Sequence, residues 1–412
     1  MENVKLQERA KMVDNVFEFR RNDRTLWGSN VYTWAILDDG LRLNEALYDY
    51  DKLMTVMKHQ AERYHFDIYM DVQNRNPQRA TTLLGGGWTR IDDDKQSVLV
   101  LDHQVLHDDE YDDFTKNPTE YFYTHALKRY CKEGITMGEI KVAIREYADF
   151  WKHVEERKAM LRDEYGSMQF FRYFVKSPYE DYWQDHRGMR ATALDIRRHP
   201  DKLKEVLDCY FETQTKPALA VGMQTTDYTG YVSPMNTAML ACNYLNIKQF
   251  EKFYWPYFKE ILDACIEHKQ RIFFFVEGVM IRFADYLSYI PKGNAMLCLE
   301  QDDLREVRKA LPNIALCGGM PSVMLGSGTP EECVDYAKNL IDDLGDGFIL
   351  CQDKMLSYKN DAQRETLQAV SDFVLNYKTE TMRRYREWII RILPINCFVR
   401  LIFPIRKASG LF

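Results

Sequence analysis

The chain has 412 residues, of which 46% are hydrophobic and 28% charged, a typical globular composition in a chain long enough to bury a large core. The net charge of −7, without any run of Lys and Arg interleaved with aromatic residues in the body of the chain, argues against nucleic acid as a partner. Nine cysteines without a CxxC pair predict reduced thiols. The N-terminus lacks the apolar core of a signal peptide, and the uncharged stretch 228–247 contains Gly230, Pro234 and many polar side chains. We therefore expect a cytoplasmic protein without a transmembrane segment.

The first half of the chain has an irregular pattern. FDIYMDV (66–72) could form an early strand of a parallel sheet, and turn residues between alternating runs predict an antiparallel excursion at 83–106. Residues 117–165 read as helices. MQFFRYFV (168–175) could form another strand of the main sheet.

The second half alternates short apolar runs with helical stretches. Runs of this length, bounded by Gly, Pro or acidic residues, are typical of strands buried on both faces. Strands separated by helices at this spacing must be parallel with right-handed crossovers, which favours a closed barrel, with a doubly wound sheet as the alternative. The predicted strands are PALAVG (217–222), RIFFFVEG (271–278), AMLCLEQ (295–301), NIALCGG (313–319) and GFILCQD (347–353), and the long segment from Met235 to Gln270 between the first two is predicted to be helical.

One helix start is clearly marked. Thr329, Pro330 and Glu332 stand where a capping box needs its N-cap, N1 and N3 residues, so a helix is predicted to begin at Pro330. GGMPSVMLGSG (318–328) is then expected to be a loop at the carboxyl end of a strand, which is the catalytic side of a barrel.

Residues that could take part in catalysis or binding follow the predicted strands. These are Glu277 and Gly278, then Glu300 with Asp302 and Asp303, then Cys317, Gly318 and Gly319, and finally Gln352, Asp353 and Lys354. Carboxyl groups gathered in a cleft raise one another's pKa and can hold a proton for general acid catalysis. Each acid could equally be a helix cap or a surface charge, and Cys317 and Cys351 could be core thiols.

The sequence does not predict a conventional zinc or phosphate site. None of the nine histidines follows a predicted strand of the second half, and neither His-x-Cys nor His-x-x-x-His occurs. GxGxxG and Walker-type loops are also absent. We therefore assign no metal ligands and expect no His/Cys zinc site, while a metal site built from carboxylates alone stays open.

Several segments resemble the uroporphyrinogen decarboxylase superfamily. The similarity covers about residues 25–378 and is most specific in GGMPSVMLGSGTPEE; it also includes the segments DDDKQSVLVLDHQVLHDDEYDDF, SPYEDYWQDHRGMRATALDIRRHPDKL and FYWPYFKEILDACIEHKQRIFFFVEG. The resemblance implies a (β/α)8 barrel of the triosephosphate isomerase type. We expect one domain at 1–378, with an N-terminal helical and antiparallel elaboration at about 1–165 and a barrel core at about 166–378.

The resemblance points to one branch of this superfamily. The Arg-rich N-terminal motif of true porphyrinogen decarboxylases is missing. The zinc ligands of thiol-methylating members would fall on Phe275, Glu277 and about Lys354, which form no thiol-type zinc site. FVEG is similar to the branch found in O-demethylase systems of anaerobic metabolism. It implies methyl transfer from a methoxylated small-molecule donor to a corrinoid (cobalamin) carried by a partner protein.

In that interpretation Glu277 or Asp303 assists the leaving oxygen, and Lys354 tunes the pKa of that acid. The expected substrate-binding residues are Asp227, Phe275, Glu300, Cys317, Gly318, Gly319 and Met320. Two alternatives remain open, namely decarboxylation of a porphyrinogen or another carboxylated substrate, and a non-catalytic barrel that binds a tetrapyrrole or corrinoid.

The C-terminal tail (379–412) differs from the rest of the chain. From Lys378 onward it carries eight basic and two acidic residues among many apolar ones. A basic amphipathic segment of this kind could pack on the barrel, contact another copy of the chain or lie on a membrane surface.

Overall fold

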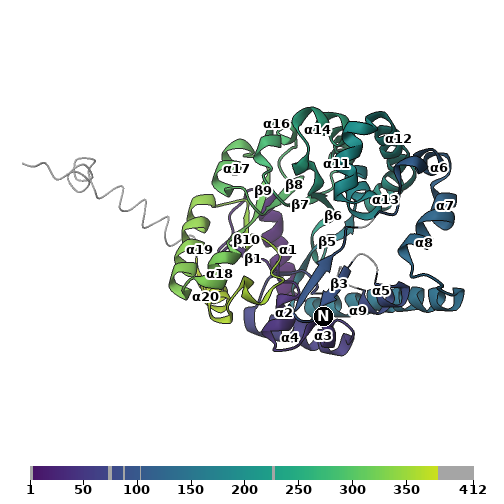
Figure 1. Ribbon diagram of the computed structural model, residues 1–412. Coiled ribbons are helices and arrows are strands. Elements are labelled where there is room, and N and C mark those ends of the chain that lie inside the picture. Colours follow the sequence, from purple (N-terminus) through teal and green to yellow (C-terminus); the bar gives the residue numbers. More distant parts are fainter. Residues whose placement is uncertain (1–2, 73–76, 87–88, 103, 225–227, 379–412) are drawn as a thin grey trace, which may run out of the picture.

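The computed structural model describes residues 3–72, 77–86, 89–102, 104–224 and 228–378. Eight parallel strands form one sheet in the order β1-β10-β9-β8-β7-β6-β5-β2, and a parallel bridge between Gly28 and Ile68 joins its two ends. The sheet is therefore a nearly closed barrel of alternating strands and helices (Figure 1). Its strands are β1 (Leu26–Trp27), β2 (Ile68–Tyr69), β5 (Met168–Phe174), β6 (Tyr231–Met239), β7 (Ile272–Val276), β8 (Ala295–Leu299), β9 (Ala315–Met320) and β10 (Phe348–Gln352).

Helices surround this barrel, and a hairpin of β3 (Thr89–Asp92) and β4 (Ser97–Val100) forms the predicted antiparallel excursion. Among the described helices, none combines the length and the apolar character needed to span a bilayer. In the first half the helices are α1 (Val4–Phe17), α2 (Trp34–Asp38), α3 (Leu43–Ala46), α4 (Tyr50–Tyr64), α5 (Gln78–Leu84), α6 (Tyr111–Lys116), α7 (Pro118–Tyr121), α8 (Leu127–Tyr130), α9 (Met137–Tyr165), α10 (Pro178–Asp181) and α11 (Met189–Arg198). They are followed by α12 (Pro200–Tyr210), α13 (Lys216–Met223), α14 (Ile247–Phe253), α15 (Trp255–Glu267), α16 (Ala284–Leu287), α17 (Leu304–Ala310), α18 (Ser322–Ser327), α19 (Pro330–Leu344) and α20 (Arg364–Asn376).

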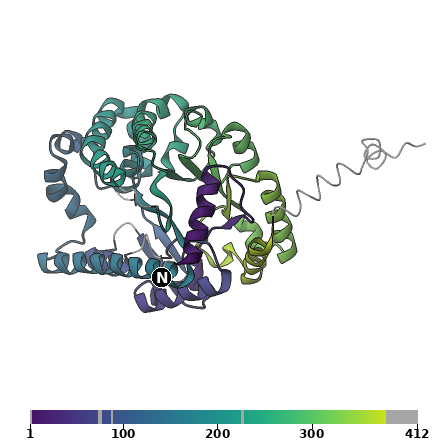
Figure 2. The same ribbon diagram turned by 180° about the vertical axis from the view of Figure 1, so that it is seen from behind.

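Two apolar cores lie on opposite sides of the barrel wall. The larger one fills the space between the strands and the outer helices. The smaller one fills the barrel interior and is closed at the amino ends of the strands by α1, which contributes Leu6, Val13, Val16 and Phe17 (Figure 2). With α1 closing that end, the functional groups are expected at the opposite end, where the strands terminate.

The prediction of a strand at PALAVG (217–222) was wrong, because these residues form helix α13. Pro217 occupies its first turn, and most of its apolar side chains face outward, with Val221 54% exposed. The true strand is β6, which begins at Tyr231, and its second half, from Met235, falls in the stretch that was predicted to be helical. Ser233, Asn236 and Thr237 interrupt its apolar pattern. Ser233 Oγ donates to the backbone oxygens of Met235 and Arg271, so its hydroxyl is satisfied inside the protein.

The prediction of a loop at 318–328 was also wrong. Residues 318–320 continue strand β9, and Ser322–Ser327 form the short helix α18. The glycines are needed for close packing, since a Cβ on Gly318 would lie 2.9 Å from the backbone oxygen of Leu299. The capping box before α19 is confirmed: Glu332 N donates to Thr329 Oγ1 at 3.2 Å, and Thr329 N donates to the Glu332 carboxylate at 2.8 Å.

The barrel includes part of the expected N-terminal elaboration. FDIYMDV contains β2, as predicted, while β1 has only two residues and gives no recognisable pattern in the sequence. Both strands precede residue 166, so a boundary drawn there divides the sheet. The basic tail at 379–412 lies outside the described residues.

Candidate active site

A cavity of about 490 Å³ opens at the carboxyl ends of the strands β5, β6 and β7. This size suits a small organic ligand. Six of its lining residues are aromatic side chains from strands and from helix α9: Tyr147, Phe150, Trp151, Phe171, Phe174 and Phe275. Three of them, Tyr147, Trp151 and Phe174, are exposed by 49%, 39% and 46% and lie at the mouth.

A buried ion pair holds α9 over this cavity. Asp71, which follows β2, accepts two hydrogen bonds from Arg157 of α9, at 2.7 and 2.9 Å. Both side chains are almost completely inaccessible to solvent. Because a bidentate pair fixes both distance and orientation, it positions the aromatic residues of α9 relative to the strand ends.

A group of charged side chains forms the polar part of the cavity. Lys176, which follows β5, lies 2.7 Å from Asp181 and 2.8 Å from Asp185. Burial raises the pKa of Asp181 to about 6; the charge of Lys176 opposes this shift and Asp185 adds to it. Lys176 and Asp185 line the cavity together with Gln184, whose side-chain oxygen accepts a hydrogen bond from Lys176 at 3.1 Å.

Glu180 is a second buried acid beside this group. Its carboxylate accepts hydrogen bonds from the backbone N–H groups of Leu240 and Ala241 and from the Tyr254 hydroxyl at 2.9 Å. Burial nevertheless raises the pKa of Glu180 to about 7. Since Leu240 lines the cavity, the Glu180 carboxylate helps to fix one part of its wall.

The predicted acidic rim is present where β7, β8 and β10 end. Glu300 is half-buried, and burial together with the negative charges of Glu277 and Asp353 raises the pKa of its carboxyl, while Lys354 opposes the shift. Burial also raises the pKa of Asp353, although the Ser322 N–H donates to this carboxylate at 3.0 Å. Glu277, Glu300, Asp353 and Lys354 thus influence one another at one end of the barrel.

The other predicted residues lie in different surroundings. Phe275 lines the cavity, whereas Cys317 and Met320 are completely buried. Gly318 and Gly319 have φ of 111° and 88° and allow β9 to pack closely against its neighbours.

Asp303 caps helix α17. Its carboxylate accepts a hydrogen bond from the Arg305 N–H at 2.9 Å, and its side chain is 54% exposed. Its proposed catalytic role stays a prediction. Asp227 lies outside the described residues.

Sequence reasoning missed the Lys176 group and the aromatic residues of α9. The predicted strand 168–175 is followed by Lys176, Asp181 and Asp185. A search of the residues after the carboxyl end of this strand, as was made for the later strands, would have found them. Asn236, another lining residue, was hidden because β6 was assigned to a helix. Nothing in the periodicity of α9 shows that its aromatic face covers a cavity.

Potential metal ligands gather in three places among the described residues: His107 with Asp109 and Glu110; Asp108 with Asp195 and His199; and Cys298 with Cys317 and Cys351. Asp195 already accepts two hydrogen bonds from Arg187, at 2.6 and 3.0 Å, which makes it a poor ligand. The His107 group is largely exposed, and the cysteine group is buried.

Comparison with known proteins supports the predicted resemblance. Residues 184–352 match the family model described as uroporphyrinogen decarboxylase (URO-D). A methyltransferase from Methanosarcina mazei shares the fold, with a TM-score of 0.58 and 11% identity over 89% of this chain and 97% of that one. A putative vitamin-B12 independent methionine synthase from Listeria monocytogenes aligns with a TM-score of 0.40 and 12% identity, covering 86% and 97% of the two chains. A search of curated proteins gave no significant match.

Proposed function

This chain carries a uroporphyrinogen decarboxylase family domain, and from that premise we propose that it moves a methyl group from a methoxylated aromatic donor to a corrinoid on a partner protein. The observation that carries the proposal is an aromatic cavity at the same end of the barrel as a group of crowded carboxyl groups. The methyltransferase from Methanosarcina mazei, which has the same fold, supports methyl transfer as the reaction class.

The cavity suits the donor better than it suits a polycarboxylate. Aromatic side chains can stack on a flat ring, and the mouth at Tyr147, Trp151 and Phe174 leaves the methyl group accessible to an acceptor that approaches from outside. Lys176 is the only cation among the described lining residues, and Asp181 and Asp185 already neutralise it. A porphyrinogen with several carboxylates would find few partners here, which disfavours decarboxylation.

The reaction needs one proton delivered to the leaving oxygen. The O–CH3 bond breaks, the oxygen keeps its electron pair and takes a proton, and the methyl group passes to the Co(I) corrinoid, which is a substrate supplied by the partner. Glu300 is suited to hold this proton, because its raised pKa favours the neutral carboxylic acid. Glu277 and Lys354 would adjust that pKa through their charges.

The test is an anaerobic assay with Co(I) cobalamin and a panel of methoxylated aromatics, with the corresponding phenols as blanks. We expect the visible spectrum to change to that of methylcobalamin, with release of the phenol in equal amount. Glu277→Gln and Glu300→Gln should slow the change at least ~100-fold. The matched control is Glu267→Gln, at the exposed end of α15 on the opposite side of the barrel.

Two results would contradict the proposal. Release of carbon dioxide from a porphyrinogen, with no methyl transfer from any donor, would assign the protein to the decarboxylases. Tight binding of a tetrapyrrole without turnover of either kind would leave a binding protein.

A further inference from the structure

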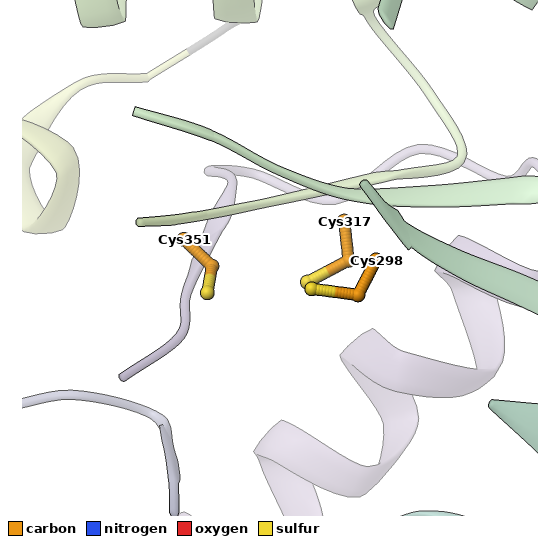
Figure 3. Close-up of side chains that lie close together, drawn as sticks. All are labelled: Cys298, Cys317 and Cys351. Atoms are coloured by element: carbon orange, nitrogen blue, oxygen red, sulfur yellow. The ribbon is translucent and has the colours of Figure 1, made fainter. Parts of the chain in front are cut away.

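Three cysteines from adjacent strands meet inside the barrel. Cys298 lies on β8, Cys317 on β9 and Cys351 on β10, and their side chains point to the same side of the sheet (Figure 3). Their sulfur atoms all lie within 4.8 Å of one another. The exposed fractions are 3%, 0% and 0%.

The strand register brings them together. Cys298 and Cys317 are direct partners in the parallel pairing of β8 with β9, and Cys351 pairs with Gly319, two residues beyond Cys317. Residues two apart on a strand point to the same face, so all three thiols enter the interior core. Only 19 and 34 residues separate Cys317 from the other two, but no short sequence motif joins them.

We propose that Cys298, Cys317 and Cys351 form a binding site for a thiophilic divalent cation such as Zn²⁺. An ion about 2.3 Å from each sulfur, in tetrahedral geometry, requires sulfur atoms about 3.8 Å apart. The observed limit of 4.8 Å is about 1 Å longer, which small rotations of the side chains can close.

The surroundings select the type of ion. The neighbouring interior side chains are apolar, including Leu26, Phe275 and Ile349, so a site with a large net charge would be costly there. A divalent ion with two thiolates and one neutral thiol has no net charge. A soft sulfur set also disfavours Mg²⁺ and Ca²⁺, which prefer oxygen ligands.

This site differs from the one that the resemblance implies for zinc-binding relatives. Their ligand positions fall on Phe275, Glu277 and about Lys354, at the ends of the strands. In contrast, the three thiols lie within the strands, and Cys298 is paired in register with Phe275, which lines the cavity. The proposed ion would therefore lie next to the inner wall of the cavity, and its binding does not depend on the proposed methyl transfer.

The experiment is metal binding by the full-length protein, fully reduced and first stripped with a chelator. Cd²⁺ is the probe, because its thiolate complexes absorb in the ultraviolet. We expect one Cd²⁺ per chain with a sulfur-to-metal absorption band, displacement of Cd²⁺ by Zn²⁺, and a higher unfolding temperature in the presence of Zn²⁺.

Variants locate the site. Cys298→Ser and Cys351→Ser should lose the band and the thermal shift, whereas Cys265→Ser should keep both, because this buried cysteine of α15 lies in the outer core. Circular dichroism establishes that each variant is folded. If the reduced wild-type protein gives no band, or if the band survives in folded Cys298→Ser and Cys351→Ser, the three thiols are ordinary core residues and the proposal fails. If neither variant folds, the absence of the band in the reduced wild-type protein still overturns the proposal.

Discussion

The two ends of the barrel place carboxyl groups in opposite electrostatic environments. At the amino end Asp67, just before β2, is completely buried and bound by Arg9 at 2.7 Å, by Arg24 at 2.7 and 2.8 Å and by the Trp27 N–H at 2.9 Å. At the carboxyl end Glu300 has Glu277 and Asp353 as acidic neighbours and Lys354 as the opposing charge.

The pKa values follow this difference. Burial alone would raise the pKa of Asp67, but the hydrogen bonds and charges of Arg24 and Arg9 outweigh it and leave the pKa below its ordinary value. The pKa of Glu300 is raised, because burial and like charge act in the same direction. The lowered pKa favours the ionised Asp67 carboxylate that the arginines bind, and the raised pKa of Glu300 shifts its carboxyl toward the protonated form that acid catalysis needs.

Removing the Asp67 carboxylate should have the largest effect. Asp67→Ala leaves two arginines without their buried partner and should lower the free energy of unfolding by about 3–5 kcal/mol. Urea denaturation at neutral pH measures the change. Asp14→Ala, which removes a surface pair with Arg271, is the control and should cost less than about 1 kcal/mol. Equal effects of the two substitutions would show that the Asp67 network does not stabilise the fold.

Acid should weaken the same network. Because the pKa of Asp67 is lower in the folded protein, its contribution is present above the unfolded pKa of about 3.9 and is lost as the pH falls through the folded value. Unfolding free energies measured down to low pH should therefore fall more steeply for the wild type than for Asp67→Ala. Parallel curves would contradict this assignment.

At the opposite end, Glu300→Gln should slow methyl transfer by about 100-fold or more, equivalent to about 2.7 kcal/mol. If Glu300 delivers the proton, the wild-type rate falls as the pH rises through the raised pKa of Glu300. This decrease with rising pH should be missing from the pH–rate profile of the variant. The measurement is a pH–rate profile with one donor. If Glu300→Gln shows the same decrease in rate with rising pH as the wild type, another group delivers the proton.

Removing an aromatic side chain from the mouth of the cavity should weaken donor binding more than it slows the chemical step. Trp151→Ala removes an aromatic wall and should raise KM about tenfold, with a smaller change in kcat. Tyr289→Ala, which removes an aromatic ring that is 41% exposed and does not line the cavity, is the control. A fall in kcat at constant KM would place Trp151 in the chemical step instead.

The smallest expected effect is at Asp303. Loss of its helix cap in Asp303→Ala should lower the unfolding free energy by about 1 kcal/mol, whereas the exposed Asp335→Ala within α19 should change it by less than about 0.5 kcal/mol. If Asp303→Ala instead leaves stability unchanged and slows methyl transfer as much as Glu300→Gln, Asp303 is the acid.

Local sequence patterns gave correct predictions where a strand is buried on both faces or where a helix is capped by its own first residues. β7, β8, β9 and β10 are apolar on both faces, and the capping box at Thr329 marks its helix without reference to the rest of the protein. The same reasoning failed at β6, where polar residues such as Ser233 are buried within a strand, and at α13, an apolar run that lies on the surface.

By itself, the sequence determined that parallel strands alternate with helices and that acids follow β7, β8 and β10, because strand burial and helix capping depend on neighbours along the chain. Only the tertiary structure decided which groups share an environment. The Lys176 group, the aromatic face of α9 and the three thiols come together through strand register and helix packing. These depend on residues far apart in the sequence, and no local pattern records them.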